Sequence, residues 1–70
     1  MPWITFSADV QLTRRGDYYL CTHNKTRAQV IIAARLKEII EQQQWVRCAP
    51  EDQEEIRSLR ELGFLVEVEP

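Results

Sequence analysis

The side chains best suited to metal binding or nucleophilic chemistry are two cysteines and the single histidine: Cys21, His23 and Cys48. Structural zinc takes four such ligands and usually draws them from cysteines spaced two to four residues apart. On a strand, Cys21 and His23 lie about 7 Å apart, too far for a direct hydrogen bond between a nucleophile and its base. We therefore predict no metal site, and we expect both cysteines to be reduced and to pack as small hydrophobic residues.

Four acidic residues come in one run at the start of a predicted helix: Glu51, Asp52, Glu54 and Glu55. Acids in a first helical turn most often complement the positive end of the helix dipole. Neither glycine belongs to a phosphate loop or a dinucleotide-binding motif. We expect a protein that is not an enzyme and that takes no cofactor and no small-molecule substrate.

The net charge of −2 conceals an uneven distribution. Residues 1–50 carry seven Lys or Arg against four Asp or Glu, a balance of +3, and residues 51–70 carry two Arg against seven acids, a balance of −5. The first part of the chain attracts anions and the second repels them. With 70 residues, 44% hydrophobic and 29% charged, the composition indicates one globular domain over residues 1–70 and excludes a disordered tail.

The elements that position these side chains begin with a strand predicted over residues 3–12, where apolar and polar residues alternate. The alternation resumes over residues 18–23, and Gly16 between the two segments favours the positive φ of a hairpin loop. A long helix is predicted over residues 27–44. Thr26 and Gln29 have the spacing of a capping box, and a broad apolar stripe follows them.

The rest of the chain is predicted to cross back to the sheet. Residues 46–48 form either a short strand or an extended connection, a helix runs from Pro50 to a glycine cap at Gly63, and a strand covers residues 64–68. This order predicts a right-handed crossover with residues 46–48 parallel to the last strand. The predicted fold class is α+β: a small single-layer mixed sheet of order ββαβαβ, with two helices packed on one face.

Four apolar residues have no place in the predicted core: Trp3, Val30, Ile31 and Ala34. Trp3 lies on the polar face of its strand, and the other three lie outside the apolar stripe of the long helix. Such residues suit contact with another protein or with a second copy of the chain, with Arg14 and Arg15 at the rim. We expect a homodimeric binding protein, of bacterial or phage origin, that regulates or inhibits a larger protein machine.

The alternative function is nucleic-acid binding through five residues: Arg14, Arg15, Tyr19, Lys25 and Arg27. Cations at the hairpin tip and at the helix N-terminus favour a phosphate, and an aromatic ring between them stacks on bases. The isoelectric point of about 5.3 and the acidic last part of the chain argue against it.

The N-terminal sequence lacks a basic segment followed by a long apolar run, and the chain holds no apolar stretch of about 18 residues. We therefore expect a cytoplasmic protein with no membrane partner. Two cysteines are also too few for the disulfide framework of a small secreted domain.

Overall fold

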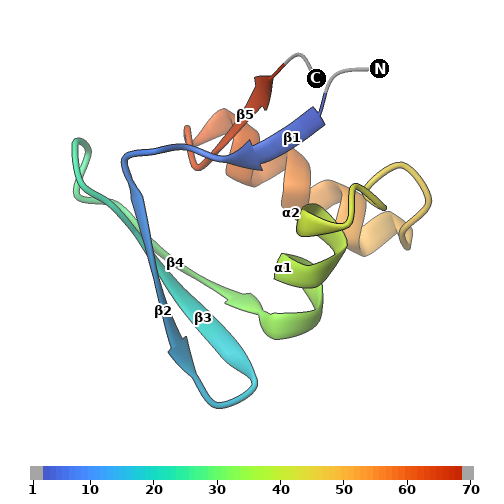
Figure 1. Cartoon of the computed structure of the whole chain (residues 1–70), viewed down its shortest axis with the longest axis horizontal. Coiled ribbons are helices and arrows are strands. Elements are labelled where there is room, and N and C mark those ends of the chain that lie inside the picture. The colour runs from blue at the N-terminus through green and yellow to red at the C-terminus, as the bar shows by residue number, and fades with distance from the viewer. Residues whose placement is uncertain (1–2, 69–70) are drawn as a thin grey trace.

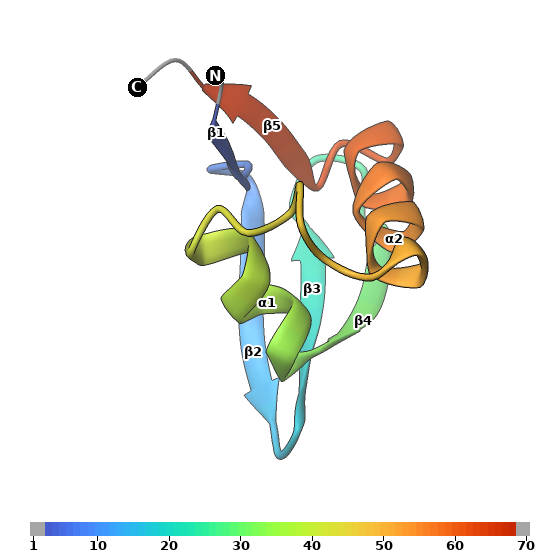
Figure 2. The same ribbon diagram turned by 90° about the vertical axis from the view of Figure 1, so that its right-hand side faces the viewer.

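The computed structural model describes residues 3–68, which form two antiparallel sheets and two helices (Figure 1). In chain order the elements are β1 (Trp3–Phe6), β2 (Val10–Arg15), β3 (Tyr18–His23), β4 (Gln29–Ala33), α1 (Ala34–Glu41), α2 (Pro50–Glu61) and β5 (Leu65–Val68). β1 pairs with β5, and β2, β3 and β4 form the second sheet in that order. Both helices lie on the same side of the three-stranded sheet (Figure 2). The α+β class is confirmed, whereas the order is ββββααβ and neither sheet is mixed.

The strand predicted over residues 3–12 is divided in two by a tight turn. The Val10 amide donates to the Ser7 carbonyl at 3.0 Å, and the Ser7 amide donates to the Phe64 carbonyl at 2.9 Å. The chain therefore leaves the sheet of β1 and enters that of β2. The alternation itself is confirmed on both sides of the corner, since Ile4 is buried and Leu12 packs against the core.

The β2–β3 hairpin is confirmed, with a shorter loop than predicted. Arg15 pairs with Tyr18, so Gly16 and Asp17 alone form the turn. Gly16 has a φ of 63° at the first central position, where a type II′ turn requires glycine. This turn matches the twist of the two strands and fixes their register.

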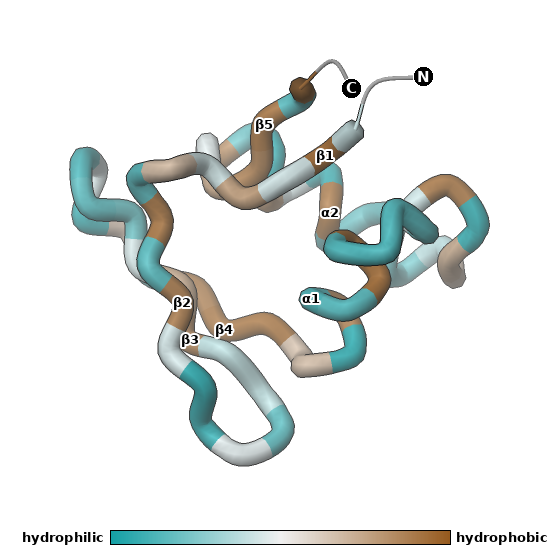
Figure 3. Tube along the Cα trace, viewed as in Figure 1, coloured by the Kyte–Doolittle hydropathy of each residue, from teal (hydrophilic) through white to brown (hydrophobic). Residues whose placement is uncertain are grey.

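The largest difference from the prediction is β4, which occupies residues expected to begin the long helix. Apolar residues over 28–34 fit a period of two as well as a period of 3.6, and with a period of two Ile32 points into the core while Ile31 points to solvent. Residues 30–34 are all apolar, as the colour of β4 in Figure 3 shows, and they are rich in β-branched side chains, which favours a strand. α1 therefore begins at Ala34 and does not span residues 27–44.

Thr26 and Gln29, predicted as a capping box, stabilise the sheet instead. Thr26 Oγ1 accepts a hydrogen bond from the Ala28 amide within the β3–β4 turn, at 3.3 Å. Gln29 Nε2 donates to Thr22 Oγ1 across the strand pair, also at 3.3 Å. The spacing that suits a helix start equally suits a hairpin.

Residues 46–48 do not form the strand that was one of two predicted possibilities. The Cys48 thiol donates to the Trp45 carbonyl at 3.1 Å within a turn that leads to α2. The last strand pairs antiparallel with β1, with Phe6 opposite Leu65, so the predicted parallel crossover is wrong. Without a strand directly before α2, β5 has no parallel partner and pairs with β1.

α2 begins and ends close to the predicted residues. Pro50 lies in its first turn, where Asp52 and its acidic neighbour complement the helix dipole. Gly63 follows the last turn with a φ of 85°. The Phe64 amide donates to the Leu59 carbonyl at 2.9 Å, which closes the helix end and directs the chain into β5.

The core lies between the helices and the inner faces of both sheets. Its buried apolar members are Ile4, Cys21, Ile32, Leu36, Ile40, Ile56, Leu59, Phe64 and Leu65. Every element except β2 contributes at least one of them, and β2 packs against them through Val10 and Leu12.

One side-chain amide joins β1 to the helical layer. Gln43 Nε2 donates to the carbonyls of Ile4 (2.8 Å) and Ile40 (3.0 Å), and Gln43 Oε1 accepts from the Ile4 amide (3.0 Å) and from Trp45 Nε1 (3.1 Å). The two bonds to Ile4 copy those of a neighbouring strand, so the amide occupies part of the free edge of β1. Gln43 itself has a φ of 57°, a conformation uncommon outside glycine.

Replacing Gln43 with alanine should lower the free energy of unfolding by about 2 kcal/mol, because the Ile4 backbone and the Trp45 indole lose hydrogen-bond partners. In a domain of this size that loss lowers the melting temperature by about 10 °C, which circular dichroism measures. The control is Gln42→Ala, at an exposed neighbour whose amide donates to Glu38, with an expected change below about 0.5 kcal/mol. Equal losses in the two variants would contradict this role of the Gln43 amide.

Candidate functional site

One face of the three-stranded sheet is turned away from both helices (Figure 1). The side chains on this face alternate with those that pack against the core. They are Gln11, Thr13 and Arg15 of β2, Tyr18, Leu20 and Thr22 of β3, and Gln29, Ile31 and Ala33 of β4. We call this set the outer sheet face. Within residues 3–68, no helix lies across it (Figure 1).

The centre of the outer sheet face is apolar. Leu20 lies between Thr13 and Ile31, and Tyr18 lies opposite Arg15. Ile31 is 61% exposed and Tyr18 is 44% exposed. Contiguous exposed apolar side chains with polar neighbours mark contact surfaces. The named side chains of this face include one cation, Arg15, and no carboxylate.

The four apolar residues predicted for partner contact do not come together. Val30 points inward and packs against the core, and Ala34 is the first residue of α1. Trp3 lies on the outward side of β1, opposite Val68 of β5. Of the four, Ile31 alone lies on the outer sheet face. The prediction placed Val30 and Ile31 on one side because it assumed helical geometry.

Three apolar residues of the outer sheet face were missing from the prediction: Tyr18, Leu20 and Ala33. Their signal was present in the sequence, because residues 18–23 already read as a strand with a period of two. The same period applied to residues 29–33 would have placed Ile31 and Ala33 beside them.

A second, smaller apolar patch lies on the outward side of the β1–β5 sheet. Trp3 is 52% exposed there, and Val66 and Val68 of β5 are each 40% exposed. In antiparallel register Trp3 lies opposite Val68 and Thr5 lies opposite Val66. Trp3 therefore has neighbours of its own and does not belong to the outer sheet face.

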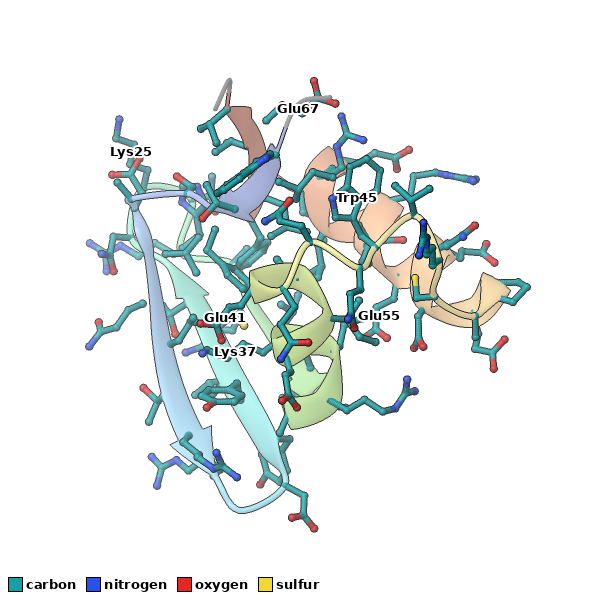
Figure 4. All side chains as sticks on the ribbon, turned by 45° about the vertical axis from the view of Figure 1, so that its right-hand side comes forward. Lys25, Lys37, Glu41, Trp45, Glu55 and Glu67 are labelled. Atoms are coloured by element: carbon teal, nitrogen blue, oxygen red, sulfur yellow. The ribbon has the colours of Figure 1, made fainter. Side chains whose placement is uncertain are left out.

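Tyr19 lies on the inner face of the sheet, in contact with two cations. The Arg14 guanidinium lies 5.6 Å from the ring centroid and donates to the Tyr19 hydroxyl at 3.4 Å, and the Lys37 ammonium lies 4.9 Å from the centroid. Lys37 also pairs with Glu41 (Figure 4), and that hydrogen bond raises the pKa of Lys37. These side chains line a hollow of about 370 Å³. Two cations on the ring argue against Tyr19 stacking on a base.

Lys25 and Arg27 lie in the turn between β3 and β4, at the opposite end of the sheet from Arg14 and Arg15. Figure 4 labels Lys25 at that end. Lys25 Nζ lies 3.6 Å from Asp9 Oδ2. Because α1 begins only after β4, neither residue lies at a helix N-terminus. The basic residues predicted as one anion site are thus separated into two groups.

The N-terminus of α1 carries an ion pair. Arg35 Nη1 lies 2.5 Å from Asp52 Oδ2, and the Asp52 side chain is buried while that of Arg35 is exposed. The hydrogen bond to Asp52 raises the pKa of the Arg35 guanidinium above its usual value. The pair joins the first turn of α1 to the first turn of α2.

His23 and the two cysteines are held by the fold. His23 Nδ1 accepts hydrogen bonds from the amides of Lys25 (3.2 Å) and Thr26 (3.3 Å), so this nitrogen already has partners. Cys21 is fully buried, and burial raises the pKa of its thiol to about 11. Cys48 is half-buried. In the described part of the chain, no three His, Cys, Asp or Glu side chains gather into a group that could hold a metal ion.

Comparison of the chain with protein-family models, with curated proteins and with solved structures found no match. None of the helices formed by residues 3–68 is long and apolar enough to cross a bilayer. The outer sheet face must therefore be interpreted from its own residues and geometry.

The two thiols should react with a disulfide reagent at very different rates at mildly alkaline pH. Cys48 is only half-buried and should react in a fast phase, whereas Cys21 is buried with a raised pKa and should react only when the fold opens. The absorbance of the released thiolate measures both phases. Cys48→Ser should remove the fast phase alone, and guanidinium should expose both thiols. Two equally fast thiols in the native protein would contradict the buried position of Cys21.

Proposed function

We propose that this protein is a small binding module that docks on a larger protein through the outer sheet face and thereby regulates or inhibits it. The observation that carries this proposal is the uncovered apolar centre of the sheet, formed by Tyr18, Leu20 and Ile31. Exposed apolar surface costs about 25 cal/mol per Å², and docking removes that cost. The proposal requires no catalytic residue and no cofactor.

The chemistry of the face favours a partner with an apolar centre and an acidic rim. Arg15 lies at the end of β2, beside Tyr18, and Arg14 lies next to it at the hairpin tip. Charges at the rim of an interface set its orientation and association rate more than its affinity. We therefore expect salt to slow association while the apolar contact maintains most of the affinity.

The size of the face limits how tightly it alone can bind. Strands lie about 4.8 Å apart and rise about 3.3 Å per residue, so three strands of five residues cover roughly 240 Å². Stable interfaces bury about 800 Å² per partner. The contact is therefore transient or extends over the hairpin tip and the sheet edges, and a transient contact suits a regulator.

A cytoplasmic site of action and a bacterial or phage origin belong to the same proposal. Two free thiols, Cys21 and Cys48, suit a reducing compartment. A chain of 70 residues with short loops suits a protein that acts by contacting a larger one.

Nucleic-acid binding is the second candidate, and one observation favours it. Arg15 lies directly opposite Tyr18 on a face without carboxylates, so a cation and an exposed aromatic ring lie side by side. Such pairs bind single strands by stacking and phosphate contact. Ile31 at the centre of the face favours a protein instead. A steep loss of affinity with added salt is the property that identifies nucleic-acid binding.

A photoreactive residue introduced at Thr13 should form a covalent adduct with one larger protein in the cells that make this chain, because Thr13 lies beside Leu20 on the outer sheet face. Tyr18→Ala should reduce the adduct at least about tenfold, as expected for an aromatic anchor. Trp3→Ala removes an aromatic residue of similar exposure from the other sheet and should leave the adduct unchanged. Mass spectrometry identifies and quantifies the product.

The same photoreactive residue at Glu54, on the exposed side of α2, is the positional control and should not reach that partner. Adducts of equal yield from both positions, or an adduct insensitive to Tyr18→Ala, would contradict docking through the outer sheet face. An adduct containing nucleic acid would instead favour the second candidate.

A further inference from the structure

β4 is an edge strand whose free side presents backbone hydrogen-bonding groups. Among the strands described, it pairs with β3 on one side only. The Ala34 amide donates to the Asp17 carbonyl at 2.9 Å, toward β3. Hydrogen-bonded positions alternate along an antiparallel ladder, so the opposite, free side carries the N–H and C=O groups of Gln29 and Ile31 and the N–H of Ala33. The Ala33 carbonyl belongs to the N-cap of α1 and accepts the first hydrogen bond of that helix.

This edge lacks the features that usually prevent strands from pairing between molecules, which are charged residues, proline or a bulge. β2, at the other edge of the sheet, ends in Arg14 and Arg15. The free edge of β1 is contacted by the Gln43 amide. β4 has the sequence QVIIA, without charge or proline, and its register with β3 runs without interruption.

We infer that the free edge of β4 binds β4 of a second copy of this chain, antiparallel and centred on Ile31. In that register Ile31 lies opposite its own counterpart, and Gln29 lies opposite Ala33. The two Ile31 residues can therefore exchange two backbone hydrogen bonds, and each Gln29–Ala33 pair can form one, from the Ala33 N–H to the Gln29 carbonyl. Val30 then lies opposite Ile32, and such pairs of β-branched side chains stabilise a sheet.

The composition of β4 makes a second copy the matching partner. The strand is nearly symmetric about Ile31, with a β-branched residue on each side and an uncharged residue at each end. The paired residues of two β4 strands carry no charge, and the flanking cations Arg27 and Arg35 lie outside the strand. β2 instead carries Arg14 and Arg15 at one end, and charged side chains on an edge strand oppose pairing between molecules.

The contact area predicts a weak dimer. A strand of five residues is about 17 Å long and, with side chains on both faces, about 10 Å high, so the paired edges cover roughly 170 Å². This is far below the 800 Å² or so per partner of a standard interface. We therefore expect a dissociation constant between about 1 μM and about 1 mM. The pairing does not depend on a partner at the outer sheet face, but it places both outer faces on one side and doubles that surface.

The test is the mass of the full chain, measured by light scattering from about 10 μM to about 1 mM. The wild-type protein should move from 8.3 kDa toward twice that mass. Ala33→Pro should remain monomeric, because the φ of −66° at Ala33 suits proline and only the outward N–H is lost. Ala33→Ser keeps that N–H and should associate like the wild type. The melting temperature of Ala33→Pro should be unchanged or higher.

A second pair of variants separates the edge from the face. Ile31→Lys and Thr13→Lys each add a positive charge to the outer sheet face, but only Ile31 lies at the centre of the proposed pairing. Ile31→Lys should raise the dissociation constant at least tenfold, and Thr13→Lys should change it less than twofold.

A wild-type chain that stays at 8.3 kDa at about 1 mM would overturn the inference, as would an Ala33→Pro chain that associates like the wild type. Loss of the dimer in Thr13→Lys would indicate packing of two outer faces instead. A monomeric wild type whose adduct with a larger protein is abolished by Ala33→Pro would show that a partner strand, and not a second copy, binds this edge. An adduct insensitive to Tyr18→Ala bears on the proposed function alone.

Discussion

The hydrogen bonds of the Gln43 amide determine how the two sheets of this protein are placed relative to its helices. The sheets have no strand in common, and the amide binds the Ile4 backbone of β1 while also contacting the end of α1 and the Trp45 indole. β1 in turn carries β5, which contacts α2. The amide thus joins the two-stranded sheet to the helices. Its hydrogen bonds are directional and fix the position of β1, whereas apolar packing alone would let β1 shift along the helices.

This arrangement explains why a face of the three-stranded sheet is uncovered. α1 contacts β1, β3 and β4, and α2 contacts β5, so the same helical layer closes the inner sides of both sheets. In a chain of 70 residues, the segments between the described strands and helices are short turns, too short to form another layer. The apolar residues on the far side of the sheet, with Ile31 at their centre, are left to solvent or to another molecule. The outer sheet face is therefore exposed because both helices pack on the inner sides of the two sheets.

The sequence predicted those strands and helices whose hydrophobic periodicity fits only one kind of secondary structure. Alternation predicted the buried side of β1 and of the β2–β3 hairpin, and Gly63 predicted the end of α2. β4 was missed because the pattern of residues 28–34 fits a helix and a strand equally well. Pairing with β3 decides between the two structures. Ile31 was singled out, but beside the wrong neighbours. The role of Gln43 could not be predicted from the sequence. Gln42, Gln43 and Gln44 are identical residues, and only the position of β1 in the fold gives Gln43 its hydrogen-bond partners.

The charge asymmetry of the chain acquires a spatial meaning in the fold. Residues 10–33, which form the three-stranded sheet, carry four Lys or Arg against one acid, whereas residues 34–68 carry five against eight. Both helices lie on the inner side of the three-stranded sheet, so the acidic residues of α2 are on the opposite side of the sheet from the outer sheet face (Figures 1 and 2). The Debye length is about 8 Å at physiological ionic strength, so α2, on the far side of the sheet, repels a partner at the outer sheet face only weakly. An acidic surface is therefore attracted to the basic residues of the sheet with only weak repulsion from α2, and it meets the outer sheet face first.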